Sequence, residues 1–177
     1  MTRTYWKTAR RRTGATVLAL GLAGLLACSS PEERATQYYQ KGMALLEQGD
    51  LVRARIELQN ALQVRPAMTE AWYALALIAE RQGQWDKVYG LLNKVLDRDP
   101  KHLRAQVKLG RLLLGAGQLD RALGASTSAL EQAPGDAEAL GLRAAVLYAL
   151  EDRDGALEQA RATLAIDPDN IDALDRK

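Results

Sequence analysis

The chain has 177 residues, 47% of them hydrophobic and 26% charged, which is typical of one folded domain and not of a disordered chain. A single Cys and a single His exclude an internal disulfide and leave too few ligands for a zinc site. The formal net charge is +2, but residues 1–28 hold five basic residues and no acidic one. The other 19 basic and 22 acidic residues give a net charge of −3, so the basic footprint of a nucleic-acid-binding protein is missing.

Residues that favour strands are scarce throughout the chain. There is no Phe, with only four Ile and seven Val, whereas Ala, Leu, Glu, Gln and Arg are abundant. Strands favour β-branched and aromatic residues, while helices favour the residues that are common here. The composition therefore predicts an all-α protein.

The first residues have the pattern of an export signal. Basic residues precede an apolar run at 15–27, which as a helix would cover roughly 20 Å, less than the hydrocarbon core of about 30 Å. This pattern favours a secretory signal over a membrane span. The run ends in Leu25-Leu26-Ala27-Cys28, which resembles the lipobox of bacterial lipoproteins.

The lipobox resemblance implies that residues 1–27 are a cleaved signal peptide and that Cys28 carries a diacylglyceryl thioether and a third acyl chain. The residue after Cys28 is Ser29 and not an aspartate, the residue that would retain such a lipoprotein at the inner membrane. In a Gram-negative host this implies sorting to the outer membrane, facing the periplasm. Residues 28–34 are small or polar and are expected to form a tether. The alternative is an unmodified thiol beside an uncleaved anchor or a chance apolar run.

The rest of the sequence repeats with a fixed period. Four prolines are spaced by 34 residues, at Pro66, Pro100, Pro134 and Pro168. The same register carries a column of small residues, Gly42, Ala76, Gly110 and Ala144, as two closely crossing helices require. A period of this length indicates a stack of similar units.

These repeats resemble the tetratricopeptide repeat, a helix–turn–helix unit. The best copy spans 69–102, with signature residues at Trp72, Leu75, Ala76, Gly83 and Pro100. The resemblance implies a right-handed α-solenoid of four units at 35–68, 69–102, 103–136 and 137–170. Residues 171–177 then form either a stub of a fifth repeat, serving as a short cap, or the continuation into a longer protein.

Turn and cap residues fit the same register. Gly49, Gly83 and Gly117 are placed to end the first helix of their units in the left-handed conformation, and Glu151 interrupts this column. Asp50 and Asp152 are expected to cap second helices, and Thr69, Asp136 and Asn170 to cap first helices.

The sequence contains no constellation that indicates catalysis. His102, the only imidazole, is expected to face solvent in a turn, and Ser126, Thr127 and Ser128 lack a nearby general base. There is no glycine-rich phosphate loop. We therefore expect no enzyme, no metal and no cofactor.

The expected functional surface is the concave groove that first helices build in this family. It implies seven candidate groove residues: Tyr39, Met43, Tyr73, Arg104, Lys108, Arg111 and Tyr148. Three of them are cations spaced i, i+4, i+7 on one helix face, which suits an extended peptide with an acidic group or a C-terminal carboxylate. The alternative is that these are ordinary solvated faces. The carboxylate clamp of chaperone-binding members is not implied, because Tyr39 and Met43 replace its Lys and Asn.

Together these features predict a lipid-anchored scaffold that binds an envelope protein or peptide in its groove. The stretch at 45–63 resembles the first repeats of exosortase-associated (PEP-CTERM) lipoproteins, which are linked to exopolysaccharide and protein sorting; pilotin-type lipoproteins of type IV pilus assembly are nearer in size. Two alternatives stay open: a non-catalytic part or subunit of a larger envelope enzyme or export complex, and a structural spacer without a ligand. The oligomeric state is open as well.

Overall fold

A computed structural model describes residues 30–168. Four predictions concern residues outside the described range: the signal peptide at 1–27, the lipidation of Cys28, the cap at Asn170 and the stub at 171–177. Within the described range the chain forms eight α-helices and no strand, which confirms the all-α prediction. The helices are α1 (Pro31–Glu47), α2 (Leu51–Val64), α3 (Thr69–Arg81), α4 (Trp85–Leu96), α5 (Leu103–Gly115), α6 (Leu119–Gln132), α7 (Ala137–Ala149) and α8 (Arg153–Ile166).

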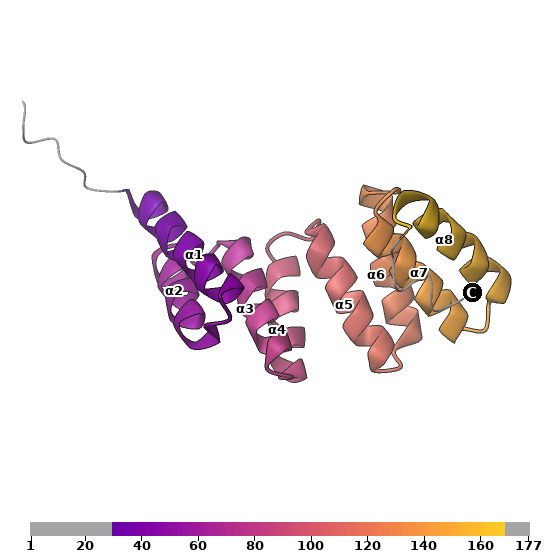
Figure 1. Ribbon diagram of the computed structural model, residues 1–177, viewed down its shortest axis with the longest axis horizontal. Helices are drawn as coiled ribbons and strands as arrows, with labels where there is room; N and C mark the ends of the chain where they lie inside the picture. Colours follow the sequence, from indigo (N-terminus) through magenta and orange to yellow (C-terminus); the bar gives the residue numbers. More distant parts are fainter. Residues whose placement is uncertain (1–29, 169–177) are drawn as a thin grey trace, which may run out of the picture.

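The helices stack in pairs along one elongated array (Figure 1). The most extensive contacts join the two helices of each expected unit: α1 with α2, α3 with α4, α5 with α6 and α7 with α8. First helices also contact the first helix of another unit, α1 with α3 and α5 with α7. This arrangement confirms four helix–turn–helix units in a solenoid.

The turn inside each unit has a residue in the left-handed conformation. The φ angles are +81° at Gly49, +67° at Gly83 and +71° at Gly117, as the glycine column predicts. Glu151 keeps this geometry in the fourth unit with φ +66°, although it has a side chain. The packing of the two helices therefore fixes the conformation of the turn, whether the residue at this position is glycine or glutamate.

Three of the predicted helix caps are confirmed. A carboxylate oxygen of Asp50 accepts a hydrogen bond from the backbone N–H of Arg53 at 2.9 Å, and Asp152 and Asp136 cap α8 and α7 in the same way. Hydrogen bonds from the Arg53 backbone and side chain lower the pKa of Asp50. A carboxylate at a helix N-terminus also interacts favourably with the helix dipole.

The prediction that Thr69 caps α3 is wrong. Thr69 is the first residue of the helix, and the cap position belongs to Met68, which makes no side-chain cap hydrogen bond. Met68 is buried in the core of the first two units. Apolar anchoring therefore fixes the start of this helix in place of a polar cap.

The predicted tether at 28–34 needs a correction, because α1 already begins at Pro31. The Ser30 hydroxyl accepts from the backbone N–H of Glu33 at 3.1 Å, and the Glu33 carboxylate accepts from the backbone N–H of Ser30 at 2.9 Å. This reciprocal pair is a capping box, and Pro31 suits the first helical position, where no N–H is needed.

The core is continuous from unit to unit. One buried cluster fills the first two units, a second runs from the second to the fourth, and a small third one lies between α7 and α8. The small-residue column is buried throughout, and a methyl group added at Gly110 would meet Leu142 of α7 and Ala125 of α6. Within residues 30–168, none of the helices combines the length and the hydropathy that a membrane crossing would require.

Candidate functional site

The centre of the groove is formed by side chains from α3 and α5. The Tyr73 ring is buried, with 8% of its surface exposed. Its centroid lies 5.0 Å from that of His102, and the Arg104 guanidinium lies 5.4 Å from the Tyr73 ring. Burial raises the pKa of Tyr73, although the charge of Arg104 acts in the opposite direction. The buried Tyr73 ring thus mainly holds the Arg104 side chain by a cation–π contact. The group exposed to solvent in the groove is the Arg104 guanidinium.

Tyr39 of α1 belongs to the same electrostatic environment. It is half-buried, and burial raises its pKa, with a further rise from the Glu70 carboxylate and an opposing effect of Arg104. Tyr39, Glu70 and Arg104 come from α1, α3 and α5. Side chains from three first helices therefore act on one another electrostatically at this point.

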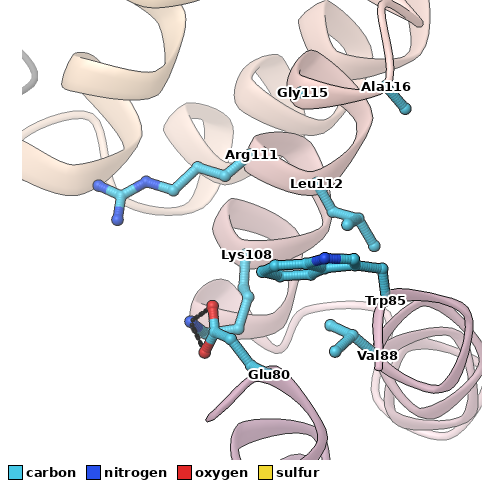
Figure 2. A pocket seen from close by; sticks show the side chains of 8 residues that line it. All are labelled: Glu80, Trp85, Val88, Lys108, Arg111, Leu112, Gly115 and Ala116. Carbon is cyan, nitrogen blue, oxygen red and sulfur yellow. Dashed lines mark hydrogen bonds and ion pairs between the residues drawn. The ribbon is translucent and has the colours of Figure 1, made fainter. Parts of the chain in front are cut away.

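The predicted row of three cations is partly neutralised. Lys108 donates to both carboxylate oxygens of Glu80, at 2.8 and 2.7 Å, and the pair is half-buried between α3 and α5. The side chain of Arg111 is exposed and extends away from this pair (Figure 2). The face thus carries alternating charges that α3 and α5 provide together, and not a bare basic stripe.

Two predicted groove residues lie toward the ends of the stack. Met43 of α1 is half-buried and packs against the core of the first two units. Tyr148 lies near the end of α7 with 57% of its surface exposed. The centre of the predicted site is therefore Tyr39, Tyr73, Arg104 and Lys108.

His102 does not have the solvent-facing role expected for it. Its Nδ1 atom accepts a hydrogen bond from the backbone N–H of Ala105 at 3.1 Å, so the imidazole is the N-cap of α5. Its ring also packs on Tyr73. Among the described residues there is no group of three or more His, Cys, Asp or Glu side chains that could hold a metal ion.

A hollow of about 540 Å³ lies beside the groove, between the second and third units. Figure 2 shows the Trp85 indole across it, with the Lys108–Glu80 pair at one end and Leu112 and Val88 near the ring. We call it the tryptophan hollow; it is lined by Glu80, Trp85, Val88, Lys108, Arg111, Leu112, Gly115 and Ala116. Trp85 is 55% exposed although it is a large apolar side chain.

A second hollow of about 490 Å³ shares part of this lining. We call it the tyrosine hollow; it is lined by Trp85, Asp86, Tyr89, Leu112, Leu113, Ala116, Gln118 and Arg121. Arg121 donates to the Tyr89 hydroxyl at 2.9 Å and lies over its ring. This hydrogen bond, reinforced by the Arg121 charge, lowers the pKa of Tyr89. Trp85, Leu112 and Ala116 line both hollows.

The sequence prediction did not include Trp85, although the repeat register contains a signal for it. The first position of the second helix is Leu51, Trp85, Leu119 and Arg153 in the four units. Leu51 and Leu119 are half-buried, whereas the larger Trp85 is exposed. The signal is thus a large aromatic residue at a position where two of the other three units have leucine.

Comparison with known proteins agrees with this geometry. Two family models match the chain, and both are described as tetratricopeptide repeat. One matches residues 39–102, and the other matches twice, at residues 79–146 and 113–175. Among solved structures, MamA from Desulfovibrio magneticus RS-1 is similar with a TM-score of 0.70 and 22% identity over 81% of each chain. The pilF protein of Pseudomonas aeruginosa is similar with a TM-score of 0.72 and 19% identity, over 82% of this chain and 68% of that one. A tetratricopeptide repeat protein from Parabacteroides merdae is similar with a TM-score of 0.68 and 22% identity, over 80% and 56%.

Proposed function

Because the chain belongs to the tetratricopeptide repeat family, a fold of protein–protein interaction scaffolds, we propose that it binds an extended segment of a cell-envelope protein along its first helices, without catalysis. The observation that carries this proposal is the joint face of α1, α3 and α5. There Tyr39, Glu70, Tyr73 and Arg104 share one electrostatic environment. Solenoids of this kind use such an extended face as their binding surface.

The face is suited to a peptide by its chemistry. Arg104 is exposed and held by the Tyr73 ring, so its guanidinium is pre-oriented and loses little freedom when a carboxylate binds. The Glu70 carboxylate, which like Arg104 acts on Tyr39, provides an acceptor for backbone N–H groups. A peptide can therefore be held by its backbone and by one acidic side chain at the same point.

We further propose that lipid on Cys28 holds the scaffold at the outer membrane, where it serves the assembly of an export, pilus or exopolysaccharide system. The lipobox at 25–28 supports the anchor. More than one acyl chain is needed, since a single chain binds a membrane only marginally. The resemblance to pilotin-type and exosortase-associated lipoproteins supports the choice of systems.

Site-specific photocrosslinking tests the scaffold. A benzoylphenylalanine at position 104 should give one defined adduct with an envelope protein in intact cells. The same probe in place of Gln59, an exposed residue of the second helix α2, should give none. Absence of an adduct from position 104, or the same mixture from both positions, would contradict the scaffold and favour a spacer.

Metabolic labelling tests the anchor separately. Cells fed radioactive palmitate should label the wild-type protein and not the Cys28→Ser variant, because the thiol is the acceptor of the lipid. Equal labelling of the two proteins would rule out Cys28 as the attachment point.

A further inference from the structure

The surface around Trp85 is built unlike the groove proper. It combines an exposed indole, two adjoining hollows and a surplus of positive charge, at the junction of the second and third units. A large aromatic side chain beside apolar hollows is typical of the few residues that dominate binding energy at an interface.

The fold of the two units, and not a mobile loop, fixes the hollows. Val88, at the base of the tryptophan hollow, is buried with 1% of its surface exposed, and Leu113 of the tyrosine hollow with 3%. Trp85 is the first residue of α4, and Leu112 belongs to the last turns of α5. Both are on helices, so the hollows are pre-formed and binding requires little reordering.

Charge points to the nature of the occupant. Three cations line the two hollows, Lys108, Arg111 and Arg121, against two carboxylates, Glu80 and Asp86. Glu80 is already compensated by Lys108 at 2.7 Å. The net surplus is one positive charge, so an acidic segment is attracted and a basic one repelled.

Shape points to the spacing of the side chains that bind. Trp85, Leu112 and Ala116 line both hollows, so the two hollows adjoin. Side chains that enter two adjoining hollows must come from residues that lie close together in one segment. Alternate residues of an extended peptide point to the same side and are about 6.8 Å apart.

We propose that the two hollows bind one extended segment of the scaffold's partner, with two aliphatic side chains at alternate positions, one in each hollow, flanked by acidic residues. The proposal rests on the scaffold function, since it names the chemistry of the segment that the scaffold holds. It places the main apolar anchor at Trp85, at the start of a second helix, and leaves the first-helix face to the charged contacts.

A labelled peptide tests the recognition directly. Fluorescein-labelled GDLSLDG should bind the purified full-length chain by fluorescence anisotropy and shift the tryptophan emission to the blue. The basic analogue GKLSLKG and the apolar-deficient analogue GDSSSDG should both bind at least about tenfold more weakly. Equal binding of the acidic and basic peptides, or no binding of GDLSLDG tighter than about 1 mM, would overturn the proposal.

Variants of the protein separate recognition from folding. Trp85→Ser should weaken GDLSLDG binding about tenfold or more, with an unchanged helical CD spectrum because the side chain is exposed. Val52→Ser, which removes an exposed apolar side chain from α2, should bind as the wild type does. If Val52→Ser weakened binding as much as Trp85→Ser, the hollows would not be the binding site.

Substitutions in the Lys108–Glu80 pair should change the affinity for the acidic peptide in opposite directions. Lys108→Gln removes the surplus positive charge and should weaken binding of the acidic peptide, whereas Glu80→Gln raises the surplus and should strengthen it. A purely structural role of the pair predicts a loss in both variants, and that result would contradict the charge argument.

Crosslinking distinguishes failure of this inference from failure of the scaffold function. A benzoylphenylalanine at position 85 should give the same adduct as one at position 104. An adduct from position 104 alone would leave the scaffold intact and remove the hollows from it. Absence of an adduct from both positions would contradict both proposals.

Discussion

At the scale of single residues, Glu151 adopts the left-handed conformation that glycine adopts in the other three turns. Its φ is +66°, and its backbone N–H donates to the Tyr148 carbonyl oxygen at 3.0 Å. A residue with a Cβ loses about 1–2 kcal/mol in the left-handed region. The fourth turn is therefore strained where the first three are not.

Glu151→Gly should stabilise the protein. Relief of the left-handed strain exceeds the greater freedom that glycine gives the unfolded chain, so we expect a net gain of about 0.5–1 kcal/mol. Urea unfolding followed by CD measures it. Glu158→Gly, in the interior of α8 and exposed, is the matched control and should lose about 1 kcal/mol. A loss of stability in both variants would show that Glu151 makes contacts that outweigh its strain.

At the scale of elements, the helix crossings depend on the absence of a side chain at particular glycines. Gly110 of α5 is buried, and an added methyl group would meet Leu142 and, at 3.2 Å, the Cβ of Ala125. Leu142 is itself fully buried, so it has no space into which to move. Gly90 of α4 is also helical, but an added methyl group there meets nothing within 4 Å.

This contrast predicts opposite effects of the same substitution. Gly110→Ala should destabilise the protein by about 1–3 kcal/mol through overpacking of the crossing. Gly90→Ala should stabilise it by about 0.8–1 kcal/mol, the difference in helix propensity. Denaturant unfolding of the two variants under identical conditions checks both signs. A gain in both would mean that α5 and α7 separate at little cost.

The elements were more predictable from the sequence than the site, for a physical reason. Gly110 is required by a close helix crossing, and Pro100 by the end of a helix. Both requirements recur with the period of the repeat, so the sequence pattern indicates them. The burial of Tyr73 and the pairing of Lys108 with Glu80 depend on contacts between different units. No local sequence pattern indicates such contacts. His102 as an N-cap was missed because imidazole is an unusual cap, and Ser30 because its capping box was assigned to a tether.

At the scale of the whole molecule, stability is distributed along the stack, and we expect it to be lowest toward the fourth unit. The buried cluster between α7 and α8 contains Ala144 and Ala160, with Leu164 packed against it. The fourth unit is joined to the third through larger side chains of α7, Leu142 and Val146, which belong to the central core. In a solenoid, stability is approximately a sum of unit and interface terms. The fourth unit therefore depends on its interface more than on its own core.

Leu142→Ala tests this dependence. It should cost about 2–5 kcal/mol, as cavities at fully buried leucines do, and the loss should fall on the coupling of the fourth unit. Hydrogen exchange measured by mass spectrometry should then accelerate in α7 and α8 and stay unchanged in α1 and α2. Leu58→Ala, an equally buried leucine of the first unit, should give the reverse pattern. Acceleration along the whole stack in both variants would show instead that the four units unfold as one cooperative block, because a local loss would then lower the stability of every helix equally.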